Sequence, residues 1–256
     1  MSNDKVDSHI QMPKCVLKRF EDKAHRFCYY DVDKKIIGNN GHAKSINTEF
    51  GYYSKQAEDY LRDNIETPFS GLLASIDTID FDKDVFTVDS VFEEQVKTFM
   101  YALIARSPRI LMEAEKHSLF WSYISETARH DFAAINGPEL ARQAKLLDGF
   151  YVTFTVNKTE KPFVLSMCGI YSFTYKNANH VILPISPTIA ITLIEKGAGN
   201  FLIDNDIKHM YLLEYESMID QFNKRAFNTQ CQEGYGYVIS HDKNVLEELV
   251  KEKAVD

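Results

Sequence analysis

The stretch that decides the fold is VDSVFEEQVKTFMYALIARSPRILMEAEKHSLFW, residues 88–121. Its first part repeats apolar side chains every three or four residues, which places them on one helix face: Val88, Val91, Phe92, Val96, Phe99, Met100, Leu103 and Ile104. Pro108 then interrupts the helix, because proline lacks the N–H donor and disfavours helical geometry at the preceding residue. The spacing resumes after the proline: Ile110, Leu111, Ala114, Leu119 and Trp121. The sequence therefore predicts two helical segments that meet at a break carrying Arg106 and Arg109.

The elements around this helix pair predict an α+β fold. Residues 26–32 and 36–37 are rich in β-formers and favour an N-terminal hairpin. Ser54 is typical of an N-cap, so a helix is expected from Lys55, with a kink near Thr67-Pro68. Downstream, strand-like segments and helical spacing follow in one order: a short helix over 137–147, strands over 150–156, 163–166, 170–175, 181–183, 189–194 and 201–203, a helix over 208–227, a strand over 235–239 and a helix over 245–250. Strands in succession rather than alternation with helices predict a mainly antiparallel sheet with a returning helix.

One compact domain is expected over residues 9–250. Asp148-Gly149 marks the change from a mostly helical half, 9–148, to a sheet-rich half, 149–250. Residues 1–8 are polar and predict a flexible N-terminus. The hairpin offers too little surface to fold alone, which favours one unit.

Composition limits the function classes. Apolar residues make up 45% of the 256 residues, enough for a sizeable core. The net charge of −8 argues against a broad basic face for nucleic acid, although a local basic cleft stays compatible with it. The chain shows no apolar run of membrane-spanning length and no signal-peptide pattern, so a cytoplasmic protein without membrane contact is expected. The widely spaced cysteines favour reduced thiols over a zinc site: Cys15, Cys28, Cys168 and Cys231.

Familiar catalytic motifs are absent from the sequence. There is no glycine-rich phosphate loop, no His-Glu-x-x-His and no Gly-x-Ser-x-Gly. The adjacent pairs His130-Asp131 and His241-Asp242 favour solvated corners over metal sites, because neighbouring residues on a helix point in different directions.

The helix break draws attention through its two arginines. Arg106 and Arg109 are three residues apart and would share a face if the turn stays helical. One interpretation is a phosphate clamp beside the N-terminus of the second helix. The other is that both guanidinium groups cap carbonyls freed by Pro108 and pair with an acid such as Glu113.

Two further side chains are candidates for acid–base work. Glu66 lies beside Ile65 and Phe69, where an apolar wall would suit a general base or a ligand for a divalent metal. It would equally serve as a plain partner for Arg106. His9 precedes Pro13 near the first helix and is either an acid or base reaching into a cleft or a polar terminal residue.

These residues also carry a family resemblance that covers about residues 9–240. In order, the motifs are His9-x-x-x-Pro13 with Leu17 and Phe20, the strand 27–31, Gly51-Tyr52-Tyr53-Ser54, Ile65-Glu66, Arg106-x-Pro108 and Leu183-Pro184-Ile185-Ser186-Pro187. The chain resembles the bacterial family called domain of unknown function 4238. It departs from the family pattern at Ile10, where the histidine usually has an aromatic neighbour, and at Ser166-Met167, where the family has Ser-Asp. If that aspartate is catalytic in the family, this chain is altered in that step.

The resemblance assigns no activity. It does point to His9, Glu66 and Arg106, the same three residues that their chemistry and position in the sequence indicate. The leading hypothesis is a nuclease-like enzyme acting on nucleic acid or another phosphate-bearing substrate, in a phage-defence or toxin role. Arg106 and Arg109 would bind phosphate, while Glu66 and His9 would supply acid–base or metal-ligand chemistry. The alternative is a non-catalytic interaction or sensor protein whose sheet, residues 150–194, binds a protein partner. Convergence of Glu66, Arg106 and His9 in an open pocket would favour the enzyme, and a closed ion pair without a cavity would favour the binding protein.

Overall fold

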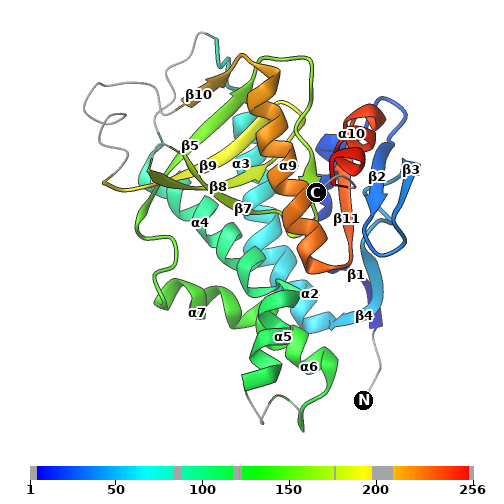
Figure 1. The fold of residues 1–256 in the computed structure, drawn as a ribbon. Coiled ribbons are helices and arrows are strands. Elements are labelled where there is room, and N and C mark those ends of the chain that lie inside the picture. Colours follow the sequence, from blue (N-terminus) through cyan, green and yellow to red (C-terminus); the bar gives the residue numbers. More distant parts are fainter. Residues whose placement is uncertain are drawn as a thin grey trace.

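The computed structural model describes residues 5–82, 88–117, 121, 123–175, 177–197 and 210–253, and the side chains of all of these except 5–7, 175, 210 and 211. Its strands are β1 (Lys5–His9), β2 (Phe27–Asp31), β3 (Ile36–Gly41), β4 (Thr48–Ser54), β5 (Phe150–Asn157), β6 (Leu165–Ser166), β7 (Tyr171–Tyr175), β8 (Ala178–Pro184), β9 (Ile189–Glu195), β10 (Met210–Leu213) and β11 (Tyr237–Ser240). Its helices are α1 (Lys14–Leu17), the 3₁₀ turn η1 (Lys18–Phe20), α2 (Lys55–Leu61), the π-helical turn η2 (Arg62–Glu66), α3 (Thr67–Ile76), α4 (Ser90–Ala105), α5 (Pro108–His117), α6 (Glu126–Ile135), α7 (Gly137–Gln143), α9 (Glu216–Glu233) and α10 (Lys243–Lys253). Figure 1 shows the mixed arrangement of helices and mostly antiparallel sheets, which confirms the predicted α+β class.

The predicted helix pair is present and breaks where expected. Helix α4 begins after Asp89, whose side chain accepts a hydrogen bond from the Phe92 N–H at 2.8 Å. The helix ends at Ala105, and Arg106 leaves helical geometry with φ −90° and ψ 0°. Helix α5 then begins at Pro108 and is described through His117. Residues 118–120 lie outside the described residues.

The five-stranded sheet separates two cores. Its strand order is β10-β5-β9-β8-β7, with only the β10–β5 pair parallel. Because side chains alternate along a strand, Phe154 and Ile191 join the larger core with α3 and α4, whereas Ile182 and Ala190 join a smaller core beneath α9. In Figure 1, α9 crosses the face of this sheet that lies opposite α3 and α4. Both faces of the sheet are thus covered by helices.

A second sheet, of order β3-β2-β11-β6, receives the predicted hairpin. Helix α9 is tied to the segment around β6 by two buried amides. Asn223 accepts a hydrogen bond from the Val164 N–H and donates one to the Pro162 carbonyl. Gln230 accepts from the Cys168 N–H and donates to the Tyr235 carbonyl. These bonds fix α9 between the two sheets.

Three expectations about local structure were wrong. Residues 5–8, expected as flexible chain, belong to β1, which pairs antiparallel with β4. Residues 210–213, expected as helix, form β10 beside β5, and the helix of that region begins only at Glu216. The expected strand over 163–166 is reduced to Leu165–Ser166. The expected strand over 201–203 lies outside the described residues.

No helix in the described ranges combines the length and the apolar character needed to cross a membrane. All four cysteines are unpaired, as expected.

Candidate functional site

Arg106 is the centre of a buried polar cluster. Only 1% of the residue is exposed, although it carries a guanidinium group. Its Nε donates to the Ala102 carbonyl at 3.2 Å, and one terminal nitrogen, Nη2, donates to the Gln11 carbonyl at 3.0 Å. The other terminal nitrogen, Nη1, is buried without a hydrogen-bond partner. A buried charged donor without an acceptor is costly, and Nη1 is the guanidinium nitrogen that keeps its capacity to donate.

Glu66 faces Arg106 from the helix α2–η2–α3. Burial raises the pKa of Glu66, and the charge of Arg106 opposes that rise. The carboxylate makes no direct ion pair with Arg106, whose bonded nitrogens reach only backbone carbonyls. The structure therefore brings the two predicted residues together without closing them into a salt bridge.

The π-helical turn η2 brings a second carboxylate to the same place. In a regular helix Glu58 and Glu66, eight residues apart, would be offset by about 80°. A π turn contains one more residue than an α turn, which restores an effective spacing of about two full turns. Glu58 accordingly interacts with Glu66: burial raises the pKa of Glu58, Glu66 raises it further, and Arg106 and His9 oppose the rise. The sequence did not indicate Glu58, because no pattern in residues 55–76 predicts the π turn that brings it to the face of Glu66.

His9, at the end of β1, completes the set of titratable groups. Its Nε2 donates to the Ala43 carbonyl at 2.8 Å, which leaves the lone pair of the neutral ring on Nδ1. Burial lowers the pKa of His9, and Arg106 lowers it as well, whereas the Ala43 bond and Glu58 raise it. The imidazole is therefore held as a neutral base within the electrostatic reach of Glu58 and Arg106.

Uncharged polar groups complete the cluster. Tyr53 is 1% exposed and donates its hydroxyl to the Ile10 carbonyl at 2.9 Å. Burial raises the pKa of Tyr53 to about 12, and Arg106 opposes the rise. The side-chain amide of Gln11 is buried with neither its oxygen nor its nitrogen hydrogen-bonded. We call His9, Gln11, Tyr53, Glu58, Glu66 and Arg106 the Arg106 cluster. Its unpaired donor is the Nη1–H of Arg106, whose charge acts on the pKa values of Glu58, Glu66 and His9.

Arg109 lies in a different environment from Arg106. It is exposed and lines an open cleft of about 450 Å³ together with Met112 and Glu233. Burial raises the pKa of Glu233, while both the guanidinium and the backbone N–H of Arg109 lower it. The carboxylate of Glu233 therefore faces the N-terminus of α5, the position at which an external phosphate was expected. Glu113 instead pairs with Lys116 at 2.7 Å.

The His130–Asp131 pair lies at the contact between α6 and β4. His130 stacks on Tyr52 with ring centroids 3.7 Å apart, and Asp131 accepts the Ser54 N–H at 2.8 Å, so this pair fastens α6 to β4. Within the described residues, no group of three His, Cys, Asp or Glu side chains is arranged to hold a metal ion.

A protein-family model, described as a protein of unknown function (DUF4238), matches residues 11–244. The chain belongs to the DUF4238 family. No curated protein and no solved structure matches it. Family membership carries no activity with it, so the chemistry must be argued from the cluster itself.

One of the two positions at which the chain was expected to depart from the family pattern lies in the core. Met167, where the resemblance implies an aspartate in the family, is fully buried in the larger core. Ser166 is also buried, and its hydroxyl lies 3.2 Å from the Cys168 sulfur. Neither side chain is among the groups that act on the pKa values of Glu66, Glu58 or His9.

Proposed function

We propose that this DUF4238 protein is an enzyme that performs acid–base chemistry on nucleic acid or another phosphate-bearing substrate at the Arg106 cluster. One observation carries the proposal: carboxyl groups with raised pKa values and an imidazole with a lowered pKa surround a buried arginine that has one unpaired donor. Shifts of this kind bring an acid and a base toward the pH at which both can transfer protons.

Each group has a role in such a reaction. His9 Nδ1 takes the proton of the attacking hydroxyl or water, and the protonated Glu66 gives its proton to the leaving oxygen. Burial keeps the pKa of Glu66 raised, and Glu66 in turn raises the pKa of Glu58, since two close carboxyl groups resist joint ionisation. The free Nη1–H of Arg106 donates to a phosphate oxygen as charge develops there.

The main cavities among the described residues include no member of the Arg106 cluster, so a substrate would have to approach its half-buried members. His9, Glu58 and Glu66 are half-buried, whereas Arg106 is buried behind them. The net charge of −8 favours a substrate that presents one phosphate locally over a long duplex held along a basic face. A defence or toxin role is part of the proposal, and the geometry supports only its chemistry.

The test compares wild type with Glu66→Gln and His9→Gln on labelled single-stranded RNA, single-stranded DNA and duplex DNA between pH 5 and 8. Glutamine at position 9 keeps a donor for the Ala43 carbonyl but removes the titrating nitrogen. Each variant should lose about 10²–10⁴-fold in rate. Asp63→Asn is the matched control, because Asp63 is an exposed carboxylate on the same π turn. Wild-type protein that leaves all three substrates intact, or a Glu66→Gln variant with full activity, would refute the proposal.

The second candidate function is a non-catalytic sensor. The interpretation in which the sheet presents a protein-binding face loses support, since helices cover both faces of that sheet. A cavity under α9 favours a sensor of a small molecule instead, and its residues are distinct from the Arg106 cluster.

A further inference from the structure

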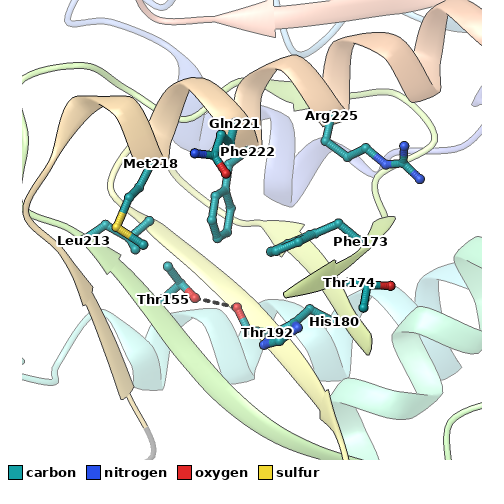
Figure 2. A pocket seen from close by; sticks show the side chains of 10 residues that line it. All are labelled: Thr155, Phe173, Thr174, His180, Thr192, Leu213, Met218, Gln221, Phe222 and Arg225. Carbon is teal, nitrogen blue, oxygen red and sulfur yellow. Dashed lines mark hydrogen bonds between the residues drawn. The ribbon is translucent and has the colours of Figure 1, made fainter. Parts of the chain in front are cut away.

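A pocket of about 270 Å³ lies between α9 and the five-stranded sheet. Figure 2 shows side chains from both elements around the space between them, among them Thr155, Phe173, His180, Thr192 and Phe222, with Arg225 at the rim. We call this site the aromatic pocket. None of its lining residues belongs to the Arg106 cluster.

Strand alternation explains why a pocket forms under this part of α9. Thr155, Thr192 and His180 project from the sheet face that carries the smaller core. Along α9, the fully buried side chains Ile219, Asn223, Ala226, Phe227 and Gln230 pack into the core or bond to the segment around β6. The neighbouring helix face, which carries Met218, Gln221, Phe222 and Arg225, stands over the threonine-bearing sheet surface and leaves a space.

The walls of the pocket are aromatic and planar. The Phe173 ring stacks on His180 with centroids 5.2 Å apart and an interplanar angle of 14°. Phe222 meets Phe173 edge to face, with centroids 5.1 Å apart at 67°. The rings of Phe173 and Phe222 can therefore make stacked and edge-to-face contacts with a further planar ring. A volume near the lower limit of ordinary ligand sites limits the occupant to a small molecule.

The floor of the pocket provides unmet hydrogen-bonding capacity. The hydroxyls of Thr155 and Thr192 lie 2.6 Å apart, so one donates to the other and the second keeps its own O–H to donate. Thr155 and Thr192 are each 1% exposed, so the remaining O–H is a buried donor. Buried hydroxyls are usually satisfied, so this floor is suited to a polar atom of a ligand.

A single cation stands at the rim. Arg225 donates its Nε–H to the Ser172 carbonyl at 2.8 Å, which holds the guanidinium beside β7. Figure 2 shows Arg225 beyond Phe173, at the end of the pocket away from Leu213 and Met218. The lining residues include no aspartate or glutamate, and no described carboxylate forms an ion pair with Arg225. The two remaining guanidinium nitrogens can therefore receive an anionic group.

From these observations we propose that the aromatic pocket binds a small planar aromatic molecule with one carboxylate. The ring lies against Phe173 and Phe222, a polar ring substituent or the carboxylate edge reaches the threonine floor, and the anionic group lies toward Arg225. This site goes beyond the proposed enzymatic function, because it uses other residues and another chemistry.

The test measures binding of 2-naphthoate by ligand-observed NMR and by the midpoint of thermal unfolding. The flat neutral probe 2-naphthylmethanol and the flexible anion octanoate serve as comparison ligands. We expect 2-naphthoate to bind with a Kd below about 1 mM and the other two to bind at least about tenfold more weakly. Equal binding of the neutral alcohol would refute the role of Arg225, and equal binding of octanoate would refute the planar class. No binding of 2-naphthoate would overturn the proposal.

Two variants locate the site. Arg225→Gln should weaken 2-naphthoate about tenfold, the effect of losing one exposed charge-assisted contact. Thr192→Val keeps the shape of the floor while removing a hydroxyl, and should weaken binding several-fold. Arg142→Gln is the control, because Arg142 is an exposed arginine that pairs with Glu94 far from the lining residues. If Arg142→Gln weakens 2-naphthoate as much as Arg225→Gln does, binding is non-specific and the site assignment fails. These outcomes do not depend on the activity of Glu66 and His9 variants, so either proposal can fail alone.

Discussion

The Arg106 cluster and the aromatic pocket each contain an arginine, but they place it in opposite environments. The cluster holds its arginine in the interior, surrounded by carboxyl groups and with one donor unmet. The pocket keeps Arg225 at the surface and carries no acid among its lining residues. Removing the partners of a buried charge destabilises the fold strongly, because the charge has lost its water. An exposed charge stays solvated, costs the fold little and can bind a ligand. Burial, rather than residue type, therefore separates the proposed role of Arg106 in reaction chemistry from that of Arg225 in ligand recognition.

Helix α9 links the two regions. Its middle forms the roof of the aromatic pocket, and its end carries Glu233, beside the break at Arg109. The pocket and the helix break that follows Arg106 therefore both involve residues of α9.

Arg106→Met is expected to have the largest effect. The variant leaves the Ala102 and Gln11 carbonyls without donors and Glu66 and Glu58 without a compensating charge, so unfolding free energy should fall by about 3–5 kcal/mol. Urea unfolding followed by circular dichroism measures it. Arg109→Gln, three residues away and exposed, should change stability by at most about 0.5 kcal/mol. Equal losses in the two variants would remove the distinction between the buried and the exposed arginine.

Asn223→Ala tests the common support. The change leaves the Val164 N–H and the Pro162 carbonyl buried without partners, which should cost about 2–3 kcal/mol. Asn228→Ala, on the same helix and half-buried, is the control and should cost less than about 1 kcal/mol. Chemical denaturation again provides the measurement. If Asn223→Ala is as mild as the control, α9 is held by apolar packing alone.

Glu66→Gln should raise stability while removing activity. Burial raises the pKa of Glu66 in the folded protein, so ionisation costs folding free energy as the pH rises through that pKa. Glutamine avoids the cost, and a gain of about 1 kcal/mol is expected at pH 7.5. The gain should shrink below the ordinary glutamate pKa of about 4.5, where the wild-type side chain is protonated in both states. Thermal unfolding at pH 4 and pH 7.5 measures the difference, and a gain that does not depend on pH would contradict the assignment.

Arg225→Gln should have the smallest effect on the fold. Its guanidinium is exposed, so the unfolding free energy should stay within about 0.5 kcal/mol of wild type even though 2-naphthoate binding weakens. Parallel urea curves with and without the ligand test this. A large loss of stability without ligand would show that Arg225 is part of the structure, as Arg106 is.

Much of the architecture follows from the sequence because the signals are local. Pro108 and the spacing around it predicted the helix break, and Ser54 predicted the start of α2, where its hydroxyl accepts the Ala57 N–H. The three residues chosen for their chemistry, His9, Glu66 and Arg106, do lie together. Their catalytic roles stay a prediction.

The errors arise where non-local pairing decides structure. Met210 and Leu213 are spaced as on a helix, yet pairing with β5 makes this segment a strand. Lys5 and Asp7 are polar, yet they pair with β4. The aromatic pocket had no sequence signal, because its lining comes from strands and a helix far apart in the chain, and its residues are ordinary core types.

The π turn at Arg62–Glu66 accommodates one additional residue without changing the face that Glu66 presents. Asn64 is exposed, and a substitution there should be tolerated. Deleting Asn64 would remove the additional residue and return the helix to regular geometry, and because seven residues of an α-helix complete about two turns, Glu66 would stay within about 20° of Glu58. A single-codon deletion at this position should therefore keep the two carboxyl groups on one face. A regular helix of the present length would instead offset them by about 80°.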